Sequence, residues 1–134
     1  MKKPCLLVLL PLACLLSLRT GAQQLSPQNR PLVLSLVCAE GDCPLLKGAP
    51  QTHGMRAGMV RLKHGQSVGW HSTDQNEEAL VILHGSGVAK LEGQSDIPLR
   101  TRMLAYIPPN TRHNITNTGP ELLEYTWVVA PAKP

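Results

Sequence analysis

The residues whose chemistry stands out lie within residues 65–85. His71 and Thr73 are separated by one residue, and because side chains alternate along a strand, both point to the same side of an extended chain. Glu78 follows a polar loop and shares one strand face with apolar residues such as Leu80. A carboxylate on an apolar, inward face needs a partner for its charge. The stretch therefore brings an imidazole, a hydroxyl and a carboxylate toward a buried setting.

A second group of polar residues follows the run Pro108-Pro109-Asn110. Proline lacks a backbone N–H and restricts the residue before it to extended geometry, so this run cannot continue a central strand. It is expected to be a turn that delivers His113 to the start of the next strand. Asn117 lies on that strand, after three intervening residues.

Together the two stretches resemble the two signatures of the cupin family. The first reads Gly, five residues, His71, one residue, Thr73, four residues, Glu78, six residues, Gly; the second reads Pro, one residue, Asn, two residues, His113, three residues, Asn. Both occur in the family's order and together span residues 65–117. Neither stretch alone would be specific, because His and Glu at such spacings are common.

The resemblance implies a fold and a set of ligands. The fold would be all-β, a single-domain cupin-like β-barrel of the jelly-roll type, also called a double-stranded β-helix. His71, Glu78 and His113 would converge inside it as ligands of one divalent metal ion. Glu78 rather than Glu77 matches the family's position, because six residues separate it from Gly85. Two imidazoles and one carboxylate with open coordination positions suit Fe(II), and also Mn, Ni or Zn.

Three positions depart from the family's pattern. Thr73 stands where the family has a second histidine, and a neutral hydroxyl is a poor ligand for a divalent transition metal; Asp74 is a candidate to replace it. Asn110 replaces a turn glycine and tolerates a positive φ, whereas Arg102 at the leading glycine position indicates a differently built turn. Three interpretations stay open: a metal site, a metal-free pocket whose polar network orients an organic ligand, and a satisfied polar core.

The elements that must position these residues read as short strands. Apolar and β-branched runs are cut by Gly, Pro and Asn about every eight to twelve residues, which is typical of an all-β sandwich or barrel. The turn His84-Gly85-Ser86-Gly87 predicts a hairpin, because glycine adopts the positive φ of tight turns. The runs expected to form strands are residues 32–38, 55–62, 67–71, 78–83, 87–91, 97–99, 103–107, 112–117 and 122–130.

The first 22 residues have the three-part pattern of a secretory signal. Lys2 and Lys3 precede an apolar run at residues 5–18, and small residues follow, with Ala22 before the expected cleavage point. The apolar run of about 14 residues is shorter than the roughly 20 that cross a bilayer, so no stable membrane anchor is expected. A lipoprotein signal at Cys14 fits less well. The sequence therefore predicts a secreted or periplasmic protein.

The chain has 134 residues, enough for one small domain. We expect a signal peptide at residues 1–22, a flexible arm at 23–31 and the barrel at 32–131. The formal net charge of +4 belongs largely to the signal, since its removal leaves 10 basic and 9 acidic residues. No cluster of Lys and Arg with interleaved aromatic residues remains, so a nucleic-acid partner is not expected.

Two cysteines, Cys38 and Cys43, remain after the signal. In an exported protein such a pair is most simply a short disulfide loop. The chain-entropy model gives a ring this small about 2 kcal/mol at best, so the bond would hold a local loop rather than the whole fold. A redox or metal-binding pair is the alternative, although the spacing fits neither pattern.

Three classes of function follow from this sequence. A metal-dependent enzyme, such as a dioxygenase or an isomerase, would use open coordination positions on the metal. A metal-free binding or sensing module would hold a small molecule at the barrel mouth. An assembly protein would form homodimers through the edge of its barrel, with residues 32–38 and 122–130 as plausible interface or sheet-completing elements. Arg100 and Arg102 share a strand face, where they either receive a carboxylate at the pocket mouth or form a solvated edge.

Overall fold

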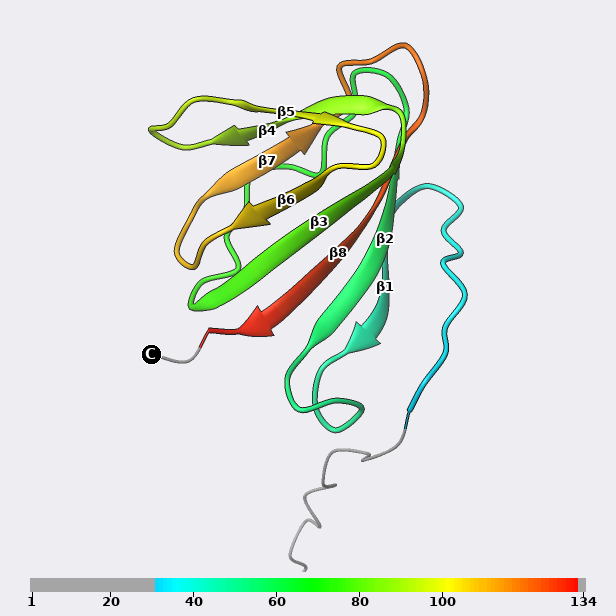
Figure 1. Cartoon of the computed structure of the whole chain (residues 1–134), viewed down its shortest axis with the longest axis vertical. Helices are drawn as coiled ribbons and strands as arrows, with labels where there is room; N and C mark the ends of the chain where they lie inside the picture. The colour runs from blue at the N-terminus through cyan, green and yellow to red at the C-terminus, as the bar shows by residue number, and fades with distance from the viewer. Residues whose placement is uncertain (1–30, 133–134) are drawn as a thin grey trace, which may run out of the picture.

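The chain folds into eight antiparallel strands that form two sheets, as a computed structural model shows for residues 31–132. The five-stranded sheet has the order β1-β2-β8-β3-β6 and the three-stranded sheet the order β5-β4-β7 (Figure 1). The strands are β1 (Gly41–Lys47), β2 (Arg56–Leu62), β3 (Asn76–His84), β4 (Ser86–Leu91), β5 (Ile97–Arg100), β6 (Leu104–Ile107), β7 (His113–Thr116) and β8 (Leu123–Pro131). This is the all-β jelly-roll architecture that the sequence predicts.

The core lies between the two sheets because side chains alternate along each strand. Leu80 and Ile82 on β3 are each 1% exposed and point inward on the same face as Glu78, as the alternation predicts. Twelve buried residues form one apolar cluster: Val60, Leu62, Leu80, Ile82, Ala89, Leu91, Leu99, Ala105, Ile107, Ile115, Leu123 and Tyr125. The inward face of each sheet is thus apolar except where polar side chains of the candidate site interrupt it.

Seven of the expected strands correspond to β2 through β8, but two expectations are wrong. Residues 32–38 form no strand and, apart from Cys38, are exposed. Residues 67–71 form only isolated bridges, from Ser67 to Thr116 and from His71 to His113. Conversely, the sequence does not predict β1, because its residues Gly41 and Pro44 favour a loop. Pro44 is tolerated because β1 is an edge strand, where a missing N–H faces no partner.

The expected hairpin at residues 84–87 is instead a corner between the two sheets. β3 pairs with β6 and β8, whereas β4 pairs with β5 and β7, so the chain changes sheets at Gly85. Gly85 has a φ of +77°, and a Cβ there would collide with the Leu122 carbonyl oxygen. Glycine is required at this corner both for its conformation and for the close approach of another segment.

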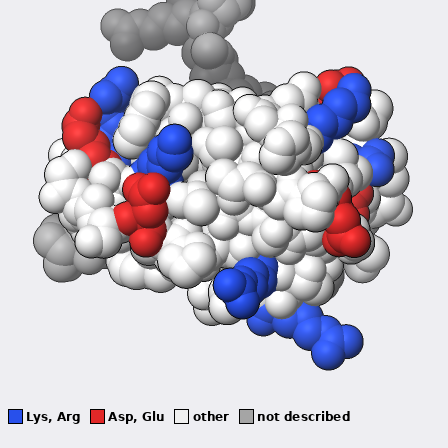
Figure 2. Space-filling model, turned by 90° about the horizontal axis from the view of Figure 1, so that it is seen from above, with Lys and Arg blue, Asp and Glu red and all other residues white. Residues whose placement is uncertain are grey.

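Apart from the buried Glu78, the charged side chains of the strands lie mainly on the outside of the two sheets. On the face shown in Figure 2, basic and acidic side chains lie next to each other around an uncharged middle. Arg112 with Glu92 at 2.8 Å and Lys63 with Glu40 at 3.1 Å are examples of such surface ion pairs. None of residues 31–132 forms a helix long and apolar enough to cross a membrane.

Candidate metal centre

His71 and His113 are brought together by a pair of backbone hydrogen bonds. The His71 N–H donates to the His113 carbonyl at 3.0 Å, and the His113 N–H donates to the His71 carbonyl at 2.8 Å. Their ring centroids lie 4.3 Å apart with the planes tilted by 58°. The segment before β3 therefore follows β7 closely enough to place two imidazoles side by side, although it forms no regular strand.

Both imidazoles are held in the same way by the backbone. Nδ1 of His71 lies 2.9 Å from the Gly69 carbonyl oxygen, and Nδ1 of His113 lies 3.0 Å from the Thr111 carbonyl oxygen. A carbonyl only accepts, so each Nδ1 carries the proton, and the neutral ring keeps the Nε2 lone pair for another partner. This is the arrangement that orients metal-ligating histidines in proteins.

Glu78 completes the group from the inner face of β3. Its Oε2 lies 3.2 Å from Nε2 of His113, and the side chains of Glu78 and His113 are 6% and 0% exposed. The two atoms are close enough for an ion pair but make no hydrogen bond with any residue that the structure describes. Ligand atoms of His71, Glu78 and His113 all lie within 4.8 Å of one another. Buried polar atoms without hydrogen bonds call for a partner such as an ion.

The pKa of His113 reflects this pairing. Burial on its own would lower the pKa, but the Glu78 carboxylate and the Thr111 carbonyl outweigh burial and raise it above the usual histidine value. The carboxylate therefore favours a positive charge at this position. A divalent cation would satisfy the same preference, and two imidazoles with one carboxylate suit Fe, Mn, Ni or Zn. The residues present thus fit a metal ion.

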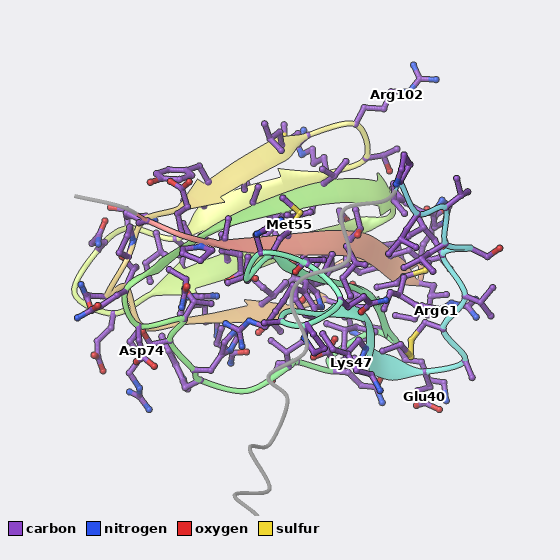
Figure 3. All side chains as sticks on the ribbon, turned by 90° about the horizontal axis from the view of Figure 1, so that it is seen from below. Glu40, Lys47, Met55, Arg61, Asp74 and Arg102 are labelled. Atoms are coloured by element: carbon purple, nitrogen blue, oxygen red, sulfur yellow. A yellow bond between two sulfur atoms is a disulfide. The ribbon has the colours of Figure 1, made fainter. Side chains whose placement is uncertain are left out.

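The positions adjacent to this group do not add a fourth candidate ligand. The Thr73 hydroxyl donates to the Asn76 carbonyl at 2.9 Å, which uses it to close the loop before β3. Asp74 is exposed, has a φ of +54° and lies outside the cluster; Figure 3 shows it on the loop at the periphery. Asn110 adopts a positive φ of 58° as expected for a glycine substitute, and Arg102 does so too, with 69°.

Two buried asparagines hold loops around the site, and one of them, Asn114, positions a histidine segment. The Asn114 side-chain oxygen accepts a hydrogen bond from the Gly69 N–H at 3.0 Å, which fixes the residue whose carbonyl holds His71. Asn117 is fully buried and its amide donates to the carbonyls of Leu62 and Glu121, at 2.8 and 2.7 Å. Asn117 therefore ties β2 to the loop before β8 and does not contact the metal centre.

A pocket of about 170 Å³ is lined by two of the three candidate ligands, His71 and Glu78. Its wall includes Tyr125 and Trp127 of β8, whose shared strand face the alternation predicts, and the Trp127 indole N–H donates to Asp42 Oδ1 at 2.8 Å. Burial, followed by the negative charges of Glu78 and Asp42, raises the pKa of Tyr125 and keeps its phenol neutral. The lining residues are Asp42, Arg56, Val60, Val68, His71, Ser72, Thr73, Glu78, Ile115, Tyr125, Trp127 and Val129.

Arg56, the arginine that lines this pocket, is not among the residues that the sequence pattern marks as candidates. Arg56, the first residue of β2, lines the pocket, whereas Arg100 and Arg102 do not. Figure 3 shows Arg102 extending away from the sheets, and Arg100 is exposed at the end of β5. Asp42 also lines the pocket, and the sequence carries no signal for it either. Nothing in the order of residues 38–56 marks β1 and β2 as the wall of a site that lies near residue 78.

Comparisons with known proteins agree with this architecture. The sequence profile of the Cupin domain family matches residues 58–129. None of the curated protein sequences compared with the chain matches it.

Three solved structures with this fold are each less than a quarter identical to the chain, so they show the fold alone. A Bacillus halodurans protein has a TM-score of 0.66 at 18% identity, covering 81% of this chain and 87% of its own. A Thermotoga maritima protein described as a predicted oxalate decarboxylase has 0.53 at 21%, covering 70% and 95%. The cupin domain of Schizosaccharomyces pombe Cnp3 has 0.60 at 19%; the match covers 68% of this chain but only 64% of that one.

Proposed function

The chain belongs to the cupin family, and from that premise we propose that it is an exported protein whose barrel binds one divalent metal ion and a small molecule. The proposed ligands are His71, Glu78 and His113. The observation that supports this most strongly is the pair of buried atoms, His113 Nε2 and Glu78 Oε2, which face each other at 3.2 Å without a hydrogen bond. Both Nδ1 atoms are meanwhile held by backbone carbonyls.

The division of labour between ion and protein follows from the pocket. When bound, Fe, Mn, Ni or Zn would act as a Lewis acid toward an oxygen of the small molecule. The protein holds the three ligand atoms, and apolar side chains such as Val68 and Ile115 line the space next to them. With three protein ligands, positions on the ion stay open toward this space.

Metal content of the purified protein tests the proposal. We expect about one equivalent of metal in the wild type and a large loss in His71→Ala and His113→Ala. His84→Ala is the matched control, because His84 is half-exposed at the end of β3 and outside the cluster. Equal metal content in all four folded proteins would contradict the proposal. If the wild type holds metal, oxygen consumption with small phenols, thiols and diketones separates an oxygenase from a binding protein.

A metal-free binding module is the second candidate, and the state of Thr73 favours it. The family's second histidine is missing, and the Thr73 hydroxyl is engaged with Asn76. If chelator-treated protein binds its small molecule as tightly as metal-loaded protein, the pocket works without an ion. A strict requirement for metal would exclude this alternative.

Export is supported by the short disulfide between Cys38 and Cys43, because such bonds persist in oxidising compartments. The expected signal peptide at residues 1–22 lies outside the described residues. Expression of the full chain in a secreting host should yield a mature protein that begins at Gln23, with an intact mass that rises by two hydrogen atoms when the disulfide is reduced to two thiols. A product that retains residue 1, or two thiols that alkylate without reduction, would contradict export.

We expect a homodimer, although not through β8. β8 lies in the middle of the five-stranded sheet, so it completes that sheet rather than offering an edge. The exposed apolar surface is instead at the edge strand β6, where Leu104 is 71% and Tyr106 56% exposed, and along residues 32–37. Light scattering at several protein concentrations tests this, and a monomer at every concentration would contradict it.

A further inference from the structure

The register of the five-stranded sheet places a cation opposite the candidate metal centre. Val129 on β8 pairs with Glu78 on β3 to one side and with Arg56 on β2 to the other. Register partners share a face, and strands lie about 4.8 Å apart, so Arg56 and Glu78 lie roughly 10 Å apart at their backbones on the inner face. Both residues line the pocket. The pocket therefore has His71 and Glu78 on one side and the exposed residue Arg56 on the other.

Arg56 has no partner within residues 31–132, unlike the other arginine of its strand. Arg61 pairs with Glu124 at 2.7 Å and donates to the Cys38 carbonyl at 3.0 Å. Asp42, the pocket's second carboxylate, accepts the indole N–H of Trp127. A guanidinium that is not engaged by the protein presents a planar pair of donors, which matches the geometry of a carboxylate.

The charges in the pocket favour an anion once metal is bound. Glu78 and Asp42 supply two negative charges and Arg56 one positive charge. A dication on the three ligands would change the net charge of the pocket from −1 to +1. An anionic ligand would then be attracted both by the ion and by Arg56, whereas the metal-free pocket would repel it.

The wall between these two ends is apolar and rigid. A Cβ on Gly58 would lie 2.5 Å from Cζ2 of Trp127, so the indole rests directly over Gly58, and its N–H is held by Asp42. Val60 and Val129 line the same pocket. Its volume of about 170 Å³ is below the roughly 300–1,000 Å³ of pockets for drug-sized ligands, which limits the ligand to a small molecule.

We propose that the pocket binds a small organic carboxylate, with a metal-ligating oxygen at the His71, Glu78 and His113 centre and its carboxylate on Arg56. The apolar body of the ligand lies against Trp127. This rests on the proposed metal binding. It adds a residue, a ligand class and an orientation that metal binding alone does not require.

The test uses metal-loaded protein titrated with pyruvate, malonate, succinate and benzoate, and with their neutral amides, followed by calorimetry and tryptophan fluorescence. For at least one acid, Arg56→Gln should weaken binding about tenfold or more while leaving the metal content unchanged; Arg56→Lys should retain part of the affinity. The neutral amides should bind weakly to the wild type and to Arg56→Gln alike. Arg100→Gln, which removes an exposed strand arginine outside the pocket, should have no effect.

The outcomes separate this inference from the proposed function. If the wild type holds metal but binds no acid of the series, or if Arg56→Gln binds acids as well as the wild type, the carboxylate assignment is overturned and metal binding stands. If the wild type holds no metal, the proposed function fails, and the carboxylate assignment fails with it because the remaining pocket is negatively charged.

Discussion

At the scale of single residues, His113 and Glu78 determine how the metal-free protein responds to pH. The pKa of His113 is raised by the Glu78 carboxylate and the Thr111 carbonyl against the effect of burial, and the neighbouring titratable ring is His71. A raised pKa in the folded state contributes stability that is fully present below the unfolded value of about 6.5. This stability is lost as the pH rises through the raised folded value.

We therefore expect the free energy of unfolding of chelator-treated protein to fall as the pH rises from about 6 through the raised pKa of His113. Glu78→Gln removes the carboxylate that favours the charged ring, so its unfolding free energy should change less over the same range. Urea unfolding at a series of pH values measures both proteins. Parallel curves for the wild type and Glu78→Gln would show that the carboxylate does not stabilise the protonated ring.

The missing fourth ligand leads to a second prediction at this scale. Thr73 lines the same pocket as His71, at the position where the family has a histidine. Thr73→His should supply a third imidazole and tighten metal binding by about tenfold, or roughly 1.4 kcal/mol. The control Thr73→Val loses only the hydrogen bond to Asn76, at a cost of about 1 kcal/mol of stability. Competition with a chelator of known affinity measures metal binding, and equal affinities of the two variants would contradict the prediction.

The candidate ligands could be predicted from the sequence because their spacing survives in the linear order. His71 and Glu78 lie seven positions apart, and His113 follows a proline turn that fixes where its strand begins. Arg56 and Asp42 could not be predicted in this way. They reach the pocket only through the pairing of β1 with β2 and of β2 with β8, and the second of these is a long-range contact that no local pattern encodes.

At the scale of elements, the N-terminal part of the chain shows where β-propensity fails. Residues 32–37 are rich in Leu and Val but form no strand, whereas the Pro-containing segment Gly41–Lys47 does. β1 pairs with β2 from Gly41 to Lys47 with a register shift near Pro44. The Arg61 guanidinium and Lys63 hold the preceding loop through the Cys38 carbonyl and Glu40. Side-chain contacts and the disulfide, rather than intrinsic preference, thus select the edge strand.

The disulfide loop should be coupled to the pocket, because Asp42 lies inside it. A double Cys38→Ser, Cys43→Ser variant should lose about 2 kcal/mol of stability at most and stay folded. Its tryptophan fluorescence should change, because Asp42 holds the Trp127 indole over Gly58. Asp42→Asn keeps the disulfide and is the control for the hydrogen bond itself. An unchanged spectrum in the folded double variant would show that the loop does not position Trp127.

At the scale of the whole molecule, the candidate ligands come from both sheets. Glu78 belongs to β3 of the five-stranded sheet, His113 begins β7 of the three-stranded sheet, and His71 is bridged to His113. An ion bound to all three would therefore link the two halves of the barrel. The two-sheet arrangement itself could be predicted, since alternating apolar positions in seven segments leave two inward faces that must cover each other. The change of sheet at Gly85 could not, because the same residues also suit a hairpin.

A ligand that binds only the folded state stabilises it by mass action, by about 2.7 kcal/mol when its free concentration is 100 times the Kd. For a domain of this size, that corresponds to a rise in Tm on the order of 10 °C. Thermal unfolding of chelator-treated protein with and without added Zn²⁺ or Ni²⁺ should show this rise in the wild type and in His84→Ala, but not in His71→Ala or His113→Ala. A rise of equal size in the His113→Ala protein would place the bound ion elsewhere on the chain, and no rise in the wild type would mean that the two sheets are not joined through a metal ion.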